Sequence, residues 1–158
     1  MKLGAHSVSA EGIDAAKIAH KRVAVVTAEF YDEIARMLES GARRALDECK
    51  IPAESRGFFR VPGAFELPPA AQRVIASGRY DAVIALGAVV RGETPHFDFV
   101  AGECARGLMD VQLKTGVPIG FGVLTTETLR QAEERADPAR GDKGYVAALA
   151  ALTLLAIG

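Results

Sequence analysis

Residues 91–100, RGETPHFDFV, combine side chains that can move protons with side chains that can hold an anion. His96 could transfer protons, because the unperturbed pKa of histidine lies near neutrality. It could equally be a surface histidine in the first turn of a helix. Asp98 could orient the imidazole, or it could simply complement the positive end of the helix dipole. The segment therefore presents a choice between chemistry and helix capping.

The first residues of the segment suit a phosphate group. Gly92, Glu93 and Thr94 precede an expected helix, and backbone N–H groups and a hydroxyl at that position can bind an anion. The alternative is an ordinary loop, with Thr94 as the N-cap and Pro95 at the first helical position. Both interpretations place the segment between a strand and a helix.

Four short apolar runs rich in β-branched residues predict buried strands. They span residues 21–28, 54–61, 80–90 and 117–125. Between and after these runs, helical spacing of apolar residues predicts four helices. These comprise residues 31–50, residues 64–78 with Pro68 and Pro69 in the first turn, a helix from the quoted segment to about Gly116, and residues 126–136 capped by Thr126.

This alternation predicts an α/β fold with a parallel sheet covered by helices on both faces. In such sheets, ligands bind at the carboxyl ends of the strands. The four expected strands lead into Phe30, the segment VPGAFE at 61–66, RGETPHF, and a region with Phe121 and Thr125. We therefore expect these four loops to line one cleft, where Phe30 and Phe65 could stack on a planar ligand or pack in the core.

Composition excludes several classes of protein. The chain has 158 residues, 49% hydrophobic and 25% charged, with a net charge of -1, which does not suit a nucleic-acid partner. No signal-peptide pattern opens the chain, and no apolar run approaches the ~20 residues of a membrane span. Cys49 and Cys104 lack metal-ligand spacing, so we expect buried thiols. We expect a cytoplasmic protein with a single domain over residues 1–158.

The two ends of the chain have opposite characters. Residues 1–20 are polar or small and predict a solvated N-terminal arm that carries His6 and His20. Residues 145–157, YVAALAALTLLAI, predict a final helix that is apolar almost all round. Such a helix is buried on several sides, and we expect part of that burial to be against another subunit.

Five stretches of the sequence resemble the lumazine synthase family. In order, they are VPGAFELP, GAVVRGETPHFDFV with the ARGLMDVQL that follows, FGVLTTETLRQAEERA and GDKG. They occur in the order and spacing of that family, and the resemblance runs from about Val23 to the C-terminus. It implies a flavodoxin-like three-layer sandwich assembled into a ring of five, with sites at subunit contacts.

The resemblance implies a transferase that acts late in riboflavin biosynthesis. Lumazine synthases join 5-amino-6-(D-ribitylamino)uracil to 3,4-dihydroxy-2-butanone 4-phosphate and give 6,7-dimethyl-8-ribityllumazine, phosphate and water. The family needs no cofactor and no metal. The resemblance implies no nucleic-acid or membrane partner, only these small-molecule substrates and other copies of the chain.

Roles for individual residues follow from the family pattern. His96 would transfer protons, Glu93 and Thr94 would hold the butanone phosphate, and Phe30 would stack on the pyrimidine. The ribityl chain would meet Ala64, Phe65 and Glu66, and the pyrimidine edge would meet the backbone of Ala88, Val89 and Val90. An adjacent subunit would contribute Phe121, Arg135 and Lys143, with Arg135 completing the phosphate site.

Two features depart from the family pattern. Val146 stands where several members carry an acid, so a charge partner for Arg135 or Lys143 is missing or comes from elsewhere. The stretch DPARGD differs from the GTKAGN-like loop often seen in members that form sixty-subunit shells, which favours a free pentamer. Two other functions stay open, namely an archaeal-type riboflavin synthase and a non-catalytic flavin- or lumazine-binding or shell protein.

Overall fold

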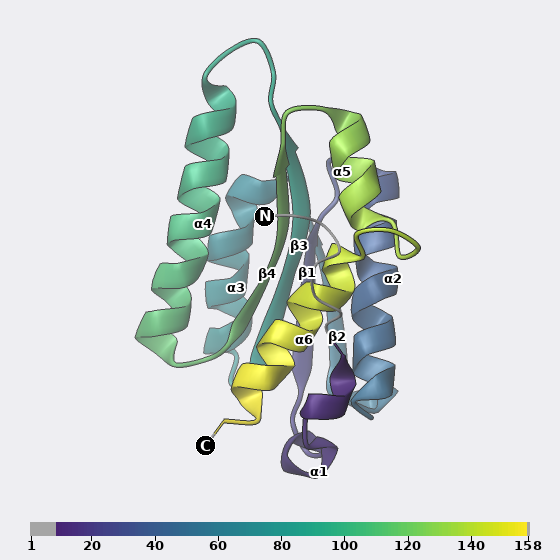
Figure 1. Ribbon diagram of the computed structural model, residues 1–158. Helices are drawn as coiled ribbons and strands as arrows, with labels where there is room; N and C mark the ends of the chain where they lie inside the picture. The colour runs from purple at the N-terminus through teal and green to yellow at the C-terminus, as the bar shows by residue number, and fades with distance from the viewer. Residues whose placement is uncertain (1–8, 158) are drawn as a thin grey trace.

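A four-stranded parallel sheet forms the centre of the computed structural model, which describes residues 9–157 (Figure 1). Across the sheet the strands lie in the order β2 (Arg56–Val61), β1 (Val23–Ala28), β3 (Ala82–Val90) and β4 (Ile119–Thr126). Every residue of β1 is buried, as are most of β3, because helices cover both faces of these central strands. The predicted strands and their parallel arrangement are confirmed.

Helices form a layer on each face of the sheet. On one face lie α3 (Leu67–Ala76) and α4 (His96–Thr115), and on the other lie α2 (Asp32–Glu48), α5 (Leu129–Ala136) and α6 (Lys143–Leu155) (Figure 1). Pro68 and Pro69 fall in the first turn of α3, and Gly116 ends α4 with a φ of 73°, as predicted. This is the expected three-layer α/β sandwich.

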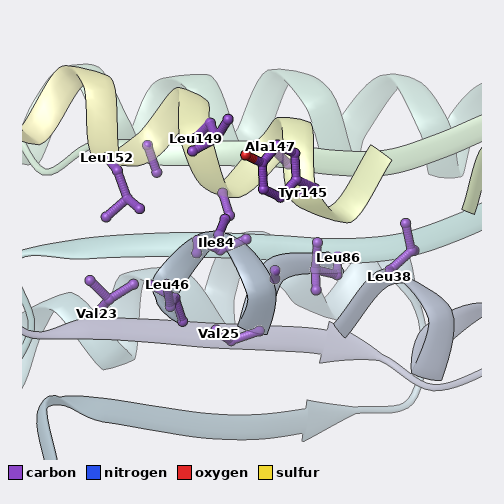
Figure 2. Packing of buried hydrophobic residues seen from close by; sticks show 14 of the residues in the cluster. Val23, Val25, Leu38, Leu46, Ile84, Leu86, Tyr145, Ala147, Leu149 and Leu152 are labelled. Carbon is purple, nitrogen blue, oxygen red and sulfur yellow. The ribbon is translucent and has the colours of Figure 1, made fainter. Parts of the chain in front are cut away.

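Alternate residues of β1 feed the two cores. Val23 and Val25 face α2 and α6 with Ile84, Leu46 and Leu149, as Figure 2 shows. Ala24 and Val26 face α3 and α4. The period of two along each strand therefore explains why a continuous apolar run is needed, since each side chain enters one core or the other.

The described part of the polar N-terminal arm is attached to the core by apolar residues. A short helix, α1 (Ala15–Ile18), follows a 3₁₀ turn at Ala10–Gly12, and the Ile18 side chain is completely buried in the core beside α2. Ala10 and Ile13 also pack against this core, so several apolar residues anchor the stretch. His20 is exposed as expected, whereas His6 lies outside the described residues.

The cap predicted at Thr126 was also wrong. Thr126 is the last residue of β4, and α5 is capped by Thr128, whose hydroxyl accepts from the Gln131 N–H at 3.1 Å. The Gln131 amide oxygen in turn accepts from the backbone of Thr128, which completes a reciprocal cap. The strand therefore continues to Thr126 and moves the start of the helix by two residues.

The terminal helix buries most of its apolar residues within its own chain. α6 packs on α2 and on the sheet, and seven of its residues are buried there, among them Leu149 and Leu152. Close approach of the two helices needs Gly144, because a Cβ at that position would collide with the carbonyl group of Leu38. Leu154 on α6 stays 45% exposed and Ile157 just after it 71% exposed, so the expected contact of this end of the chain with another subunit stays a prediction.

Candidate active site

The order of the strands creates a crevice between the carboxyl ends of β1 and β3. The chain leaves β1 towards α2 on one face and leaves β3 towards α4 on the other, so the two connections diverge. A cavity of about 510 Å³ lies there. Its lining comes from the segments after β1 and β2, the end of β3 and the start of α4: Phe30, Tyr31, Gly63, Ala64, Phe65, Glu66, Ala88, Val89, Val90, His96, Phe99 and Val100.

Most of the residues that the family pattern singled out meet in this cavity. His96, Phe30, residues 64–66 and residues 88–90 all line it. Phe30 is 74% exposed and Phe65 is 57% exposed, so neither ring is part of the core. These two rings are available to a planar ligand, and their exposure excludes the alternative of core packing.

Glu66 is held in place by the turn that contains it. The backbone N–H of Gly63 donates to the Glu66 carboxylate at 3.0 Å, across a 3₁₀ turn at Ala64–Glu66. Only one carboxylate oxygen makes this bond. The carboxylate can therefore accept further hydrogen bonds, for example from hydroxyl groups, without losing its position.

The proposed phosphate loop is exposed and lies outside the cavity lining. Residues 92–95 are all exposed, and α4 begins at His96 with Pro95 in the capping position. Thr94 is therefore not the N-cap, and its hydroxyl accepts only a long bond of 3.4 Å from the His96 N–H. The cap interpretation was wrong by one residue, because Pro95 forms a turn before the helix starts.

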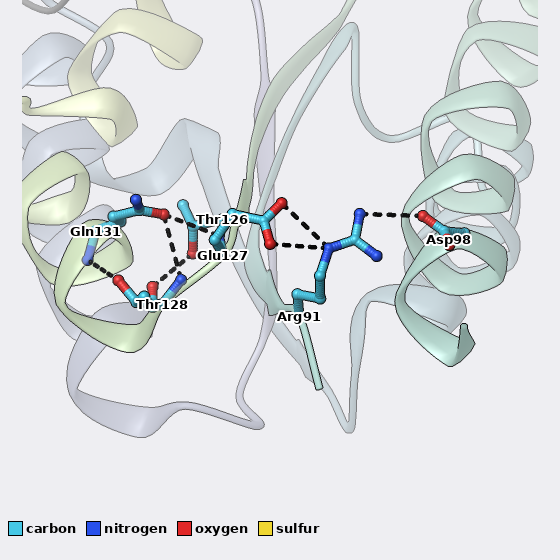
Figure 3. Close-up of polar contacts among 6 residues, drawn as sticks. All are labelled: Arg91, Asp98, Thr126, Glu127, Thr128 and Gln131. Carbon is cyan, nitrogen blue, oxygen red and sulfur yellow. Dashed lines mark hydrogen bonds and ion pairs between the residues drawn. The ribbon is translucent and has the colours of Figure 1, made fainter. Parts of the chain in front are cut away.

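Arg91 links the two sides of this loop (Figure 3). Its Nε lies 2.9 Å from the Glu127 carboxylate, in the turn between β4 and α5, and its Nη2 lies 3.3 Å from the Asp98 carboxylate on α4. These two acids raise the pKa of the Arg91 guanidinium. Asp98 thus pairs with Arg91, and the structure gives it no bond to the His96 imidazole.

A second hollow, of about 440 Å³, lies between β4, α5 and α6. Its lining includes Phe121, Thr125, Arg135, Lys143 and Val146. The expectation that all four loops line one cleft was therefore wrong. Phe121 lies on the edge strand β4, opposite Ala85 and well before the strand ends at Thr126. It is therefore too far along the strand to reach the carboxyl edge of the sheet, where the cavity lies.

Arg135 and Lys143 give the hollow its positive charge. The Arg135 guanidinium donates to the Gln131 carbonyl at 3.1 Å, and within residues 9–157 it makes no ion pair. Lys143 opens α6 directly after Asp142, whose φ of 51° is left-handed and whose carboxylate pairs with Arg44. The turn at Asp142 therefore fixes where the lysine enters the hollow.

Comparison with known proteins shows which family the chain belongs to. The family model for 6,7-dimethyl-8-ribityllumazine synthase matches residues 20–157. The chain belongs to the lumazine synthase family. The resemblance found in the sequence is thus confirmed over nearly its whole length.

Two curated relatives carry the family name. A 6,7-dimethyl-8-ribityllumazine synthase of Chlorobium phaeovibrioides (strain DSM 265 / 1930) is 47% identical over 134 residues, covering 85% of this chain and 86% of the relative. One of Nitratidesulfovibrio vulgaris (strain DSM 19637 / Miyazaki F) is 49% identical over 131 residues, covering 83% and 84%. Residues 20–157, which the family model matches, include all the residues that line the cavity and the hollow.

Some cavity residues escaped the sequence analysis. Tyr31, Phe99 and Val100 line the cavity of this lumazine synthase family member beside the predicted ones. Phe99 follows His96 by three positions, a spacing that places both on one side of a helix. Helical spacing within RGETPHFDFV could therefore have found it.

Neither cysteine has the properties of a nucleophile. Cys49 and Cys104 are buried, and burial raises the pKa of both thiols, that of Cys104 to about 12. Both stay protonated near neutral pH, where a thiol is a poor nucleophile.

Within residues 9–157, no helix has the length and apolar character needed to cross a membrane. The candidate chemistry therefore rests on the cavity and the hollow.

Proposed function

We propose that this chain catalyses the reaction of its family. It condenses 5-amino-6-(D-ribitylamino)uracil with 3,4-dihydroxy-2-butanone 4-phosphate to give 6,7-dimethyl-8-ribityllumazine in riboflavin biosynthesis. The observation that supports this most is the meeting of His96 with two exposed aromatic rings, Phe30 and Phe65, in one cavity at the sheet edge. A proton-transfer group beside a surface for a planar ring suits this condensation.

The cavity would orient the pyrimidine for attack. The ring stacks on Phe30, its polar edge meets backbone groups of residues 88–90, and the ribityl hydroxyls meet Ala64, Phe65 and Glu66. Because the pyrimidine amine is already a nucleophile, the protein need not supply one. Holding the two substrates together can contribute up to ~7–11 kcal/mol, which makes positioning the larger part of the catalysis.

His96 would move the protons that the reaction requires. The amine attacks the ketone and water leaves as the imine forms. The hydroxyl-bearing carbon of the butanone then loses a proton, phosphate leaves from the terminal carbon, and the resulting enol becomes a carbonyl group. The second amine attacks the newly formed carbonyl group, and a second water leaves as the ring closes. His96 accepts and returns protons in these steps, a contribution typically worth ~10²–10⁴-fold. Backbone N–H groups at Glu93 and Thr94 of the exposed loop, with the Thr94 hydroxyl, hold the phosphate.

We further propose that the phosphate site is completed by a neighbouring copy of the chain. Arg135, Lys143 and Phe121 lie in a hollow separate from the cavity that contains His96. Exposed apolar side chains on α4, namely Phe99, Met109 and Leu113, favour association with other copies. We propose a free ring of five, in which each site pairs the cavity of one copy with the hollow of the adjacent copy. We also propose that the protein is cytoplasmic, because its two cysteines are free thiols.

Two measurements test these proposals. Incubation with both substrates should produce the lumazine absorbance, and its absence would refute the proposed reaction. The shared site is tested by mixing His96→Ala and Arg135→Ala subunits through unfolding and reassembly. With random equal mixing in a head-to-tail ring, roughly a quarter of the contacts join an intact His96 to an intact Arg135, so activity should exceed that of either variant. Failure to regain activity would place the whole site within one subunit.

A further inference from the structure

Arg91 is a charged residue that the proposed mechanism leaves without a task. It stands at the end of β3, where its backbone N–H donates to the Thr126 carbonyl at 2.8 Å, and its side chain leaves the sheet towards α4 (Figure 3). It does not line the cavity or the hollow. Its three neighbours are instead Glu127, Asp98 and the ring of Phe97, whose centroid lies 4.3 Å from the guanidinium carbon.

The anchor on the β4 side is rigid. The backbone N–H of Glu127 donates to the Gln131 amide oxygen at 2.8 Å, and the next residue, Thr128, forms the reciprocal cap with Gln131. The Thr126 hydroxyl donates to the Thr128 carbonyl at 2.8 Å. The turn that carries Glu127 is therefore fixed on both sides, and its carboxylate offers Arg91 a fixed attachment point (Figure 3).

The loop that Arg91 spans has few other restraints. Residues 92–95 are exposed, Pro95 gives α4 no side-chain cap, and the bond from the His96 N–H to Thr94 is long. The pair with Asp98 joins the residue before the loop to the first turn of the helix after it. This ion pair closes the loop across its base, on the side where His96 begins α4.

We propose that Arg91 is a positioning residue that holds the loop 92–95 and His96 in place without touching the substrate. The inference rests on the proposed function, in which this loop holds the phosphate of the butanone. A planar guanidinium can bridge two carboxylates at once through charge-assisted hydrogen bonds, whereas a neutral amide offers fewer donors and no charge. Through Glu127 and Asp98, Arg91 ties the start of α4 to the start of α5.

Neutralising the arginine should loosen the phosphate loop and little else. We expect Arg91→Gln to raise the dissociation constant of inorganic phosphate and the KM for the butanone phosphate by about fivefold, the upper range for exposed ion pairs. The KM for the pyrimidine and the melting temperature should stay unchanged. Arg36→Gln is the matched control, because Arg36 is exposed and pairs with Asp32 on α2 at 3.0 Å, away from the loop.

Neutralising the acids separates positioning from direct binding. If Arg91 positions the loop, the double variant Asp98→Asn with Glu127→Gln weakens phosphate binding as Arg91→Gln does, and all three changes together weaken it no further. If Arg91 instead contacted phosphate itself, removing its two carboxylate partners would tighten phosphate binding. Tighter binding in the double variant, unchanged binding in Arg91→Gln, or an equal rise in both KM values would each overturn the inference.

The wild-type protein separates this inference from the function on which it rests. A wild-type chain that neither forms lumazine nor binds inorganic phosphate overturns the proposed function and the role of Arg91 with it. A wild-type chain that does both, with an Arg91→Gln variant that binds phosphate equally well, overturns the role of Arg91 alone.

Discussion

The cavity and the hollow have similar volumes, about 510 and 440 Å³, but opposite chemical character. The cavity is formed by the segments after β1 and β2, the end of β3 and the start of α4, and it is lined by aromatic rings, backbone groups and His96. The hollow is formed along β4 and by the starts and ends of helices, and it carries Arg135 and Lys143. One suits a planar ring, the other an anion.

This difference shows that neither region alone suits both substrates. The cavity offers a proton-transfer group and stacking surfaces but no lysine or arginine in its lining, whereas the hollow offers two cations but no histidine. A reaction that joins a pyrimidine to a butanone phosphate needs both sets of groups. Supplying them from adjacent copies is the simplest way to combine the two regions.

The largest expected effect is in the cavity, at His96. We expect His96→Ala to lower kcat by about 10²–10⁴-fold, the usual contribution of proton transfer by a side chain, while activity remains above the uncatalysed rate. His20→Ala is the matched control, because His20 is an exposed histidine outside the cavity. Steady-state kinetics decide the matter: unchanged kcat would return His96 to a plain surface residue.

The next effect belongs to the hollow, at Arg135. Loss of a charged hydrogen-bond donor to phosphate should lower kcat/KM for the butanone phosphate by about 10- to 150-fold in Arg135→Ala, from ~1.5–3 kcal/mol. Arg140→Ala is the control, because Arg140 is an exposed arginine that pairs with Asp137 nearby but does not line the hollow. Equal losses in the two variants would show that the hollow responds only to overall charge.

A smaller effect is expected at Phe30, on the pyrimidine side. We expect Phe30→Ala to raise the KM for the pyrimidine by about 2- to 10-fold, since aromatic pairing contributes ~0.5–1.5 kcal/mol beyond area burial. The KM for the butanone phosphate should not change. Phe58→Ala serves as the control, because Phe58 is also partly exposed but lies on β2, outside the cavity. An equal rise in both KM values would contradict a stacking role.

The sequence predicted the fold and the cavity because both follow from local patterns. Continuous apolar runs predict buried parallel strands, and their carboxyl ends share one edge, so Phe30, residues 61–66 and His96 could be placed together. The helix caps were harder. Thr126 and Thr128 are both plausible caps in the sequence, and only the register of β4 against β3 shows that the first belongs to the strand.

The hollow could not be predicted as a separate region from pattern alone. The position of Phe121 within β4 depends on strand register, which tertiary packing sets. The composition of the apolar final helix indicates burial but not which surface covers it, and Leu154 is still 45% exposed. The pairing of Arg91 with Glu127 joins residues 36 positions apart, and the sequence gives no periodic signal for it.

The smallest effect is expected from Val146→Glu, which introduces the acid that the family pattern led us to expect at this position of the hollow. Val146 lies in the first turn of α6, and it lines the hollow with Arg135 and Lys143. A carboxylate near a helix N-terminus is compatible with the helix dipole, so Val146→Glu should fold normally. Its negative charge would compete with phosphate for the two cations and raise the KM for the butanone phosphate. Because exposed charge pairs contribute ~0.2–1 kcal/mol, the rise should stay below about fivefold.

Val146→Gln is the control for this change, because the glutamine side chain has the same shape as glutamate but carries no charge. A KM that rises for glutamate but not for glutamine, and that rises less at high salt, would show that the positive charge of the hollow acts on the phosphate. If glutamate lowered the KM instead, its carboxylate would be orienting Arg135 more than it neutralises it. The hollow of this chain would then be an incompletely organised anion site, in contrast to the cavity, where the Gly63 N–H already holds the Glu66 carboxylate in place.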